Sequence, residues 1–171
     1  MGIVNSRPTA DVSATSWTIN DGYETYAEAM NAAATAPTVL AATGGISLTN
    51  ASAGVTVEIA QSNLPASAAI LGWRAYVYAE VDGTASHATI NLTVDDSGNN
   101  LYIEDDEVFG ATGDFTGWKS SSYAEAATVP TTLLIFGQAP AGATIIIRNA
   151  YVEVYFRTAN NRASQSIGLR I

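Results

Sequence analysis

The sequence predicts an all-β chain: an antiparallel β-sandwich (jelly roll) with one short helix and extended terminal arms. Three observations lead to this class. Apolar and polar residues alternate with period two over long stretches, turn-rich runs separate about eight short strands, and one segment has helical spacing instead. The 171 residues contain no internal repeat, so we expect one sandwich domain at 11–156 between an N-terminal arm (1–10) and a basic C-terminal arm (157–171).

The first regular element expected along the chain is a helix within residues 21–34. Tyr23, Tyr26 and Met30 recur at helical spacing, and acidic residues fall in its first turn, where the helix dipole favours them. Strands are then expected at 45–49 and 55–60, before the strongest alternating stretch of the sequence begins.

That stretch covers residues 71–81, in which apolar residues such as Trp73 occupy every odd position. An Asp-Gly turn follows, and two further runs at 88–95 and 101–104 are separated by a second turn rich in Asn and Gly. We therefore expect an antiparallel meander of three strands with one buried face.

The last strands are expected at 131–136 and 143–157. In the final strand Val152 and Val154 share one face, and continuing their alternation backwards would place Arg148 on the apolar side. Either a β-bulge near Arg148-Asn149 corrects the register, or residues 145–147 are covered on both faces.

Composition excludes several functional classes. Without cysteine there can be no disulfide, thiolate zinc site or cysteine nucleophile, and no apolar run approaches the ~18 residues of a membrane span. A net charge of −9 argues against nucleic acid as a partner. Only 13% of residues are charged, against about 25% in an average domain, which suggests that much of the surface meets another protein.

The basic residues concentrate at the ends of the chain, where no acid occurs. They belong either to solvated termini or to assembly arms that dock on acidic bodies of neighbouring copies. Ile167, Leu169 and Ile171 alternate with small or polar residues, as in a strand added to a neighbour's sheet. The candidate arm residues are Arg7, Arg157, Arg162, Ile167, Leu169, Arg170 and Ile171.

The sequence shows no catalytic constellation, so we expect a non-enzyme without a cofactor. The single histidine, His87, falls at a turn, and phosphate-binding glycine motifs are absent. The acidic run 104–107 is read as a solvated loop, a paired-carboxylate glycosidase site, a docking patch for the arms, or a Ca²⁺ site. The calcium ligands would be Asp95, Asp96, Asp105 and Asp106.

The aromatic residues offer the remaining candidates for binding. Trp73 is expected in the core, Trp17 as a cap of the sandwich, and Trp118 in a loop. Exposed tyrosines on outward strand faces either pack against a partner subunit or stack on sugar rings. The candidate interface or glycan-stacking residues are Tyr76, Tyr78, Trp118, Tyr151 and Tyr155.

The region 17–156 resembles the jelly-roll, galactose-binding-like sandwich domains of tailed-phage structural proteins. The resemblance rests on Trp17, an Asp-Gly followed by Tyr and Ala, the run 70–79, Trp118 and the closing run 150–156. It implies a structural virion protein, above all a capsid decoration protein that forms dimers or trimers and binds the shell's major capsid protein. Its location would be the virion, assembled in the host cytoplasm. The alternative is a carbohydrate-binding module or a tail or collar accessory protein that contacts host-surface glycans.

Overall fold

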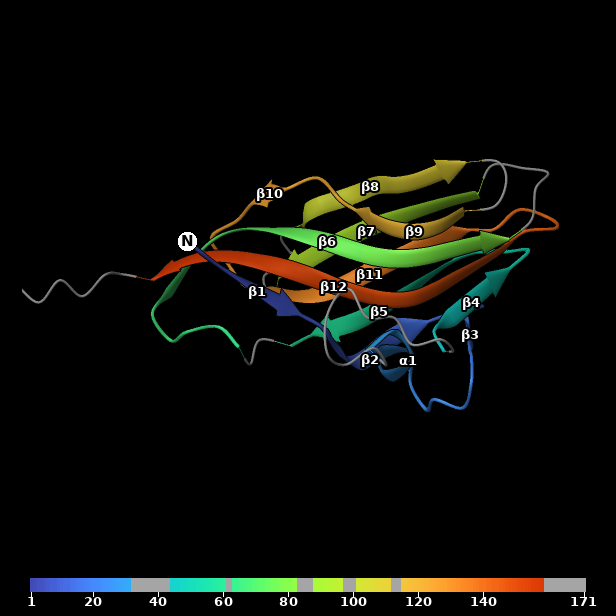
Figure 1. Ribbon diagram of the computed structural model, residues 1–171, viewed down its shortest axis with the longest axis horizontal. Helices are drawn as coiled ribbons and strands as arrows, with labels where there is room; N and C mark the ends of the chain where they lie inside the picture. Colours follow the sequence, from blue (N-terminus) through green and yellow to red (C-terminus); the bar gives the residue numbers. More distant parts are fainter. Residues whose placement is uncertain (32–43, 61–62, 83–87, 97–100, 112–114, 159–171) are drawn as a thin grey trace, which may run out of the picture.

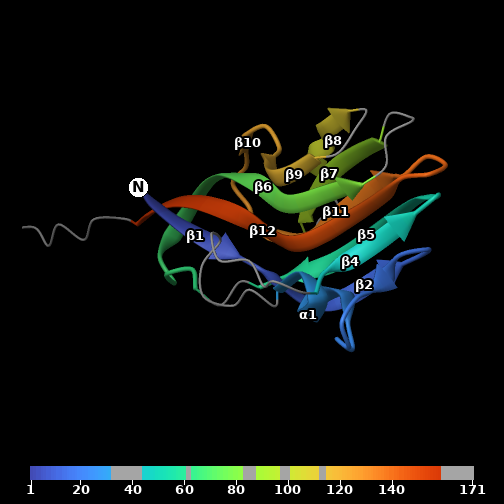
Figure 2. The same ribbon diagram turned by 45° about the vertical axis from the view of Figure 1, so that its right-hand side comes forward.

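The computed structural model describes residues 1–31, 44–60, 63–82, 88–96, 101–111 and 115–158, and of 101–111 it describes only the backbone. Within these ranges the chain forms two antiparallel sheets that pack face to face, as Figures 1 and 2 show from two sides. The seven-stranded sheet contains β1 (Gly2–Ser6), β3 (Thr18–Ile19), β4 (Ile46–Thr49), β6 (Ala68–Asp82), β9 (Phe115–Ser120), β10 (Ala124–Glu125) and β12 (Thr144–Thr158). The five-stranded sheet contains β2 (Pro8–Ala14), β5 (Ser52–Ile59), β7 (Ala88–Asp96), β8 (Leu101–Ala111) and β11 (Pro130–Gln138).

The strand order confirms the predicted jelly roll. In one sheet β4, β12, β6 and β9 are successive neighbours, and in the other β5, β11, β7 and β8 are. The chain therefore passes from sheet to sheet at most of its connections, as two interlocked Greek keys require.

The core lies between the two sheets and is built from the inward-facing positions of the long strands. Trp73, Val77, Leu92, Ile135 and their neighbours are fully buried. Each buried aliphatic side chain of this size stabilises the fold by about 1.5–3 kcal/mol relative to an exposed one. Trp73 also donates its indole N–H to the Thr128 carbonyl oxygen at 2.9 Å, which satisfies its polar atom. Trp17 is buried as well and donates to the Ala53 carbonyl oxygen at 3.1 Å.

The expected three-stranded meander is wrong in one respect. β7 and β8 pair as predicted, but β6 belongs to the other sheet and pairs with β12, β9 and β10. Alternation gives the inward face of each strand, and both sheets turn that face to the same core. The pattern therefore cannot distinguish a hairpin from a crossover between sheets.

The β-bulge predicted near Arg148-Asn149 is confirmed. The register between β12 and β6 shifts between Ile147 and Asn149, so Ile147 and Ala150 both face the core. Arg148 is the extra residue, and its side chain lies on the outer face with that of Asn149, opposite Tyr78.

The expectation of a free N-terminal arm at residues 1–10 is wrong. β1 pairs with β12 over Gly2–Ser6, and β2 begins at Pro8 and pairs with β5. The chain thus crosses from one sheet to the other at Arg7. The period-two pattern is too short on either side of Arg7 to have indicated two strands.

The predicted helix is present and begins at Tyr26. α1 covers Tyr26–Asn31, and residues 32–34 of the predicted segment lie outside the described residues. Asp11 of β2 accepts hydrogen bonds from the backbone N–H groups of Tyr26 and Ala27 at 3.0 and 2.8 Å. Thr25 adds a local cap, since its Oγ1 accepts from the Glu28 N–H at 3.1 Å, and the two caps together fix where the helix begins. No helix among the described residues is long and apolar enough to span a bilayer.

Two further expectations require correction. Trp118, predicted in a loop, lies in β9, and the acidic run 104–107, read most simply as a loop, lies within β8. His87 lies outside the described residues.

Candidate binding surface

The outer face of the seven-stranded sheet gathers the aromatic residues that the sequence singled out. Tyr76 and Tyr78 alternate with the core residues of β6, and Tyr151 does so on β12. The register places Tyr76 opposite Tyr151 and Tyr78 opposite Trp118 of β9. Directly opposed residues of an antiparallel pair share a face, so all four side chains point away from the core.

These four rings form one contact network, which we call the aromatic cluster (Tyr76, Tyr78, Trp118, Tyr151). The rings of Tyr76 and Tyr151 are stacked, with centroids 4.8 Å apart and an interplanar angle of 7°. The Trp118 ring makes edge contacts at 5.5 Å with both Tyr78 and Tyr151. Since β6 lies between β9 and β12, the indole must reach across β6 to meet Tyr151.

Tyr155 belongs to the same face but not to the cluster. Its ring meets the ring of Tyr123 at 5.2 Å in a T-shaped contact, and its hydroxyl donates to Glu153 Oε2 at 2.6 Å. Burial, together with this bond to Glu153, raises the pKa of Tyr155 well above its usual value. Tyr123, 39% exposed, was not predicted as a site residue because it stands among serines and alanines without an alternating pattern.

Charged groups flank the aromatic cluster on both sides. Arg148 donates from Nε and Nη2 to the two Glu80 carboxylate oxygens at 2.5 and 2.9 Å, a bidentate pair beside Tyr78. At the other end Arg74 lies near Tyr76, Tyr155 and Glu153, and its hydrogen bond with Tyr76 contributes most to raising its pKa. Guanidinium and carboxylate groups next to rings give the surface both donors and acceptors for a polar ligand.

Tyr151 is the most enclosed member of the cluster, at 6% exposure. Burial disfavours its phenolate and, with Glu153 nearby, raises the pKa of Tyr151 to about 12. On the same face of β12, Asn149 is fully buried, and within the described part of the chain neither its side-chain oxygen nor its nitrogen has a hydrogen-bond partner. Only its place at a β-bulge could have indicated this residue from sequence.

The candidate calcium ligands do not form a site in the described part of the chain. Asp96 is buried and accepts a hydrogen bond from Thr128 Oγ1 at 2.7 Å, and no group of three or more potential ligands gathers among the described side chains. The side chains of Asp105 and Asp106 lie outside that part, and the backbone register sets Asp106 opposite Leu92, three positions from Asp95. Calcium binding stays a prediction, to be checked by calorimetry.

Some of the candidate arm residues lie within the described part of the chain and others do not. Arg7 donates from Nη1 to Oδ1 of Asn31 in α1 at 3.2 Å, so it is not presented on a free arm. Arg157 lies in β12, exposed and opposite Ala69. The remaining five lie outside the described residues: Arg162, Ile167, Leu169, Arg170 and Ile171.

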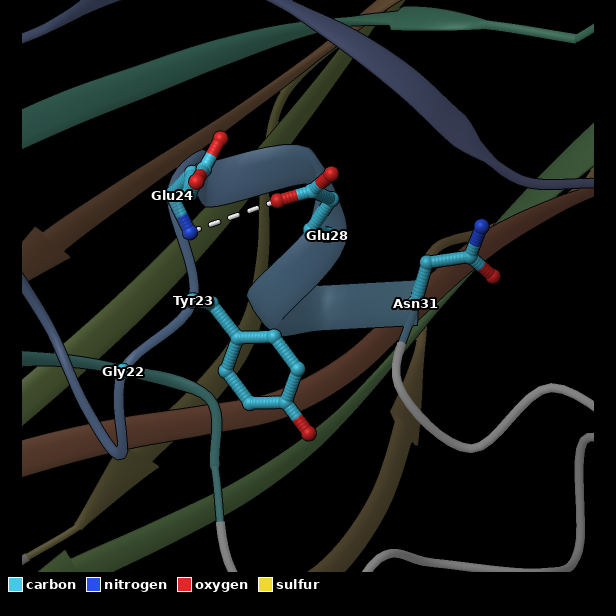
Figure 3. Close-up of a pocket in the computed structure, with 5 residues that line it drawn as sticks. All are labelled: Gly22, Tyr23, Glu24, Glu28 and Asn31. Atoms are coloured by element: carbon cyan, nitrogen blue, oxygen red, sulfur yellow. Dashed lines mark hydrogen bonds between the residues drawn. The ribbon is translucent and has the colours of Figure 1, made fainter.

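A separate open depression of about 500 Å³ lies beside α1, lined by Gly22, Tyr23, Glu24, Glu28 and Asn31. Figure 3 shows the Tyr23 hydroxyl pointing away from the two carboxylates, and the Glu24 N–H donates to Glu28 Oε2 at 3.3 Å. The acidic groups thus serve the start of the helix, and the arrangement gives no reason to place a ligand there.

Comparison with known proteins adds little beyond the architecture. No family model and no curated protein matches the sequence. Among solved structures, the C-terminal family 6 carbohydrate-binding module of the laminarinase LamC from Zobellia galactanivorans is 8% identical, with a TM-score of 0.40, 90% of this chain covered and 98% of that chain. A family 29 carbohydrate-binding module is 12% identical, with a TM-score of 0.41 and 90% of each chain covered. A second family 29 module, in complex with cellulohexaose, is 14% identical, with a TM-score of 0.39, 89% of this chain covered and 91% of that chain.

Similarity at this level says nothing about what the present chain binds. It also provides no link to a virion, so that part of the expectation stays untested. The functional proposal must rest on the side chains of this protein.

Proposed function

We propose that the protein is a non-catalytic binding module that recognises a glycan on the outer face of the seven-stranded sheet. The observation that carries this proposal is the aromatic cluster, four rings from three strands joined in one network. Sugar rings present apolar C–H faces between polar hydroxyl groups. They therefore suit a surface on which aromatic rings lie between hydrogen-bonding side chains.

Trp118 is the central residue of the proposed glycan surface. It is partly exposed, lies across β6 between Tyr78 and Tyr151, and has the largest ring on this face. The Arg148–Glu80 pair lies beside Tyr78, within the same layer of side chains. A sugar in contact with the indole would have a guanidinium and a carboxylate in reach of its hydroxyl groups.

The test begins with a glycan array and continues with calorimetry on each glycan retained. Trp118→Ala should weaken binding at least about tenfold, the equivalent of 1.4 kcal/mol. Phe136→Ala is the matched control, because Phe136 is a partly exposed aromatic on the outer face of the other sheet, and it should leave affinity unchanged. Thermal unfolding of both variants separates lost contacts from lost structure. An array without any retained glycan, or equal losses for the two variants, would refute the proposal.

A second candidate function is the structural virion role, above all capsid decoration. One observation favours it: Ile3, Tyr123 and Tyr155 form an apolar patch at one end of the same sheet. Ile3 is 51% exposed and lies opposite Tyr155, whose ring contacts Tyr123. Exposed apolar patches of this kind mark protein interfaces. Co-sedimentation of the protein with assembled particles tests this role, and Ile3→Asp should reduce occupancy if the patch meets the shell.

A further inference from the structure

An apolar groove lies at one end of the sandwich, apart from the aromatic cluster. It is a shallow, open depression of about 460 Å³, lined by Ile70, Leu71, Glu125, Ala126 and Ala127. Four of these five residues are apolar, and Glu125 contributes a carboxylate. Figure 1 shows β10, the N-terminus and the end of β12 together at this end.

The groove continues into the exposed apolar patch described above. Tyr123 donates its hydroxyl to the Leu71 carbonyl oxygen at 2.9 Å, so its ring stands at the rim of the groove. Tyr155 and then Ile3 follow across the sheet. Ile70 and Ala126 also pack against the core, so groove and patch meet at Tyr123, on the edge of the sheet, and we call the two together the apolar strip.

Acidic side chains border this strip. Glu125 is exposed on β10, opposite Gly72, and Gly72 is in turn opposite Tyr155. Glu153 accepts the hydroxyl hydrogen bond of Tyr155 and has Arg74 nearby, so Glu125 is the carboxylate that a partner's cation would meet. A partner that matches the strip must therefore combine apolar side chains with positive charge.

We propose that the strip binds the C-terminal segment, residues 159–171, of a second copy of this chain. Ile167, Leu169 and Ile171 recur at every second residue, so an extended segment presents all three on one face. The segment also carries Arg162 and Arg170 and no acidic side chain, which complements the exposed carboxylate of Glu125. This proposal goes beyond glycan binding and does not depend on it.

The course of β12 favours a second copy over the same chain. β12 ends at Thr158, opposite Ala68 at the very start of β6, so the chain leaves this end of the sandwich heading away from its own groove. Residues 159–166 extend by at most roughly 26–29 Å. A return of Ile167 to Leu71 of the same chain would require a reversal of the direction in which β12 ends, whereas contact with a neighbour would not. On the groove side the Leu71 carbonyl oxygen already accepts from the Ala126 N–H at 3.3 Å and from the Tyr123 hydroxyl. Residues 68–70 of β6 have no partner strand on that side within the described ranges, which leaves room for added pairing there alone.

Cysteine pairing tests this directly, because the chain contains no native cysteine. One preparation carries Leu169→Cys and a second carries Ala127→Cys, and the two are mixed under mild oxidation. We expect disulfide-linked dimers that contain one chain of each kind, since the two positions come close enough to bridge. Leu169→Cys mixed with Ser13→Cys, an exposed position on β2, is the control.

Dimers no more abundant than in the control would overturn the proposal. So would a chain carrying both Leu169→Cys and Ala127→Cys that closes its disulfide within a monomer. Sedimentation of the full-length chain gives an independent measure: Leu169→Asp should weaken self-association at least about tenfold, and Ser164→Asp, with the same charge on the other face of the segment, should weaken it far less. Equal effects of the two substitutions would also refute the assignment.

Discussion

Replacement of Asn149 by leucine should stabilise this protein, although it removes a polar residue from a strand. The exposed fraction of Asn149 is 0%, and neither polar atom of its side-chain amide has a hydrogen-bond partner among the described residues. A buried amide that leaves water without finding a partner costs about 1–3 kcal/mol. Leucine keeps the branch at Cγ and has no polar atom, so it avoids this cost, and only the overpacking of its larger side chain opposes the gain.

The expected gain from Asn149→Leu is therefore about 1–3 kcal/mol in the free energy of unfolding. For a chain of this length each kcal/mol raises the melting temperature by roughly 2–4 °C. Urea denaturation followed by tryptophan fluorescence measures the change, with the slope of the transition as a check on two-state behaviour.

Asn5→Leu is the control for this substitution. Asn5 lies on the outer face of the same sheet, opposite Glu153, and is only partly buried. Its replacement should change stability by no more than about 0.5 kcal/mol. A clear loss of stability in Asn149→Leu, with Asn5→Leu unchanged, would show that the amide of Asn149 makes compensating bonds and that the reasoning is wrong.

Three further predictions concern the backbone, the pH dependence and the core. Gly45→Ala should cost more than Gly142→Ala: both glycines have positive φ, +93° and +86°, but an added Cβ would overlap the Ile147 carbonyl oxygen only at Gly45. Equal losses in denaturation would contradict the steric argument. Because the pKa of Tyr151 is raised from 10.0 to about 12, its contribution to stability is complete below pH 10 and is lost as the pH rises to about 12. Tyr151→Phe should remove that part of the pH dependence of stability. If the free energy of unfolding of the variant changes with pH between 9 and 12 as it does in the original protein, Tyr151 is not the group responsible. Trp73→Ala should cost about 3–5 kcal/mol, read from the same urea titration, since the side chain is fully buried and its hydrogen bond to Thr128 is lost.

Local periodicity made several features of this protein predictable. The inward positions of β6, β7 and β12 follow from alternation alone, because side chains of a strand point to opposite faces. The bulge at Arg148 followed from the same rule, since only an extra residue lets both Ile147 and Ala150 face the core. Trp73 and the outward tyrosines of β6 and β12 could be assigned for this reason.

The assembly of the aromatic cluster, in contrast, depended on which strands become neighbours. The sequence suggested a hairpin from β6 to β7, yet β6 pairs with β12 and β9 from distant parts of the chain. Only these pairings bring Trp118 to Tyr78 and place Tyr76 on Tyr151.

The sequence by itself determined which side chains each long strand buries and which it presents, because that choice depends on the parity of positions within one strand. The tertiary structure alone decided that β1 joins β12, that Asp11 caps α1, and that the apolar groove forms beside β10. These features arise from contacts between residues far apart in the chain, and strand parity carries no information about which strand will lie alongside.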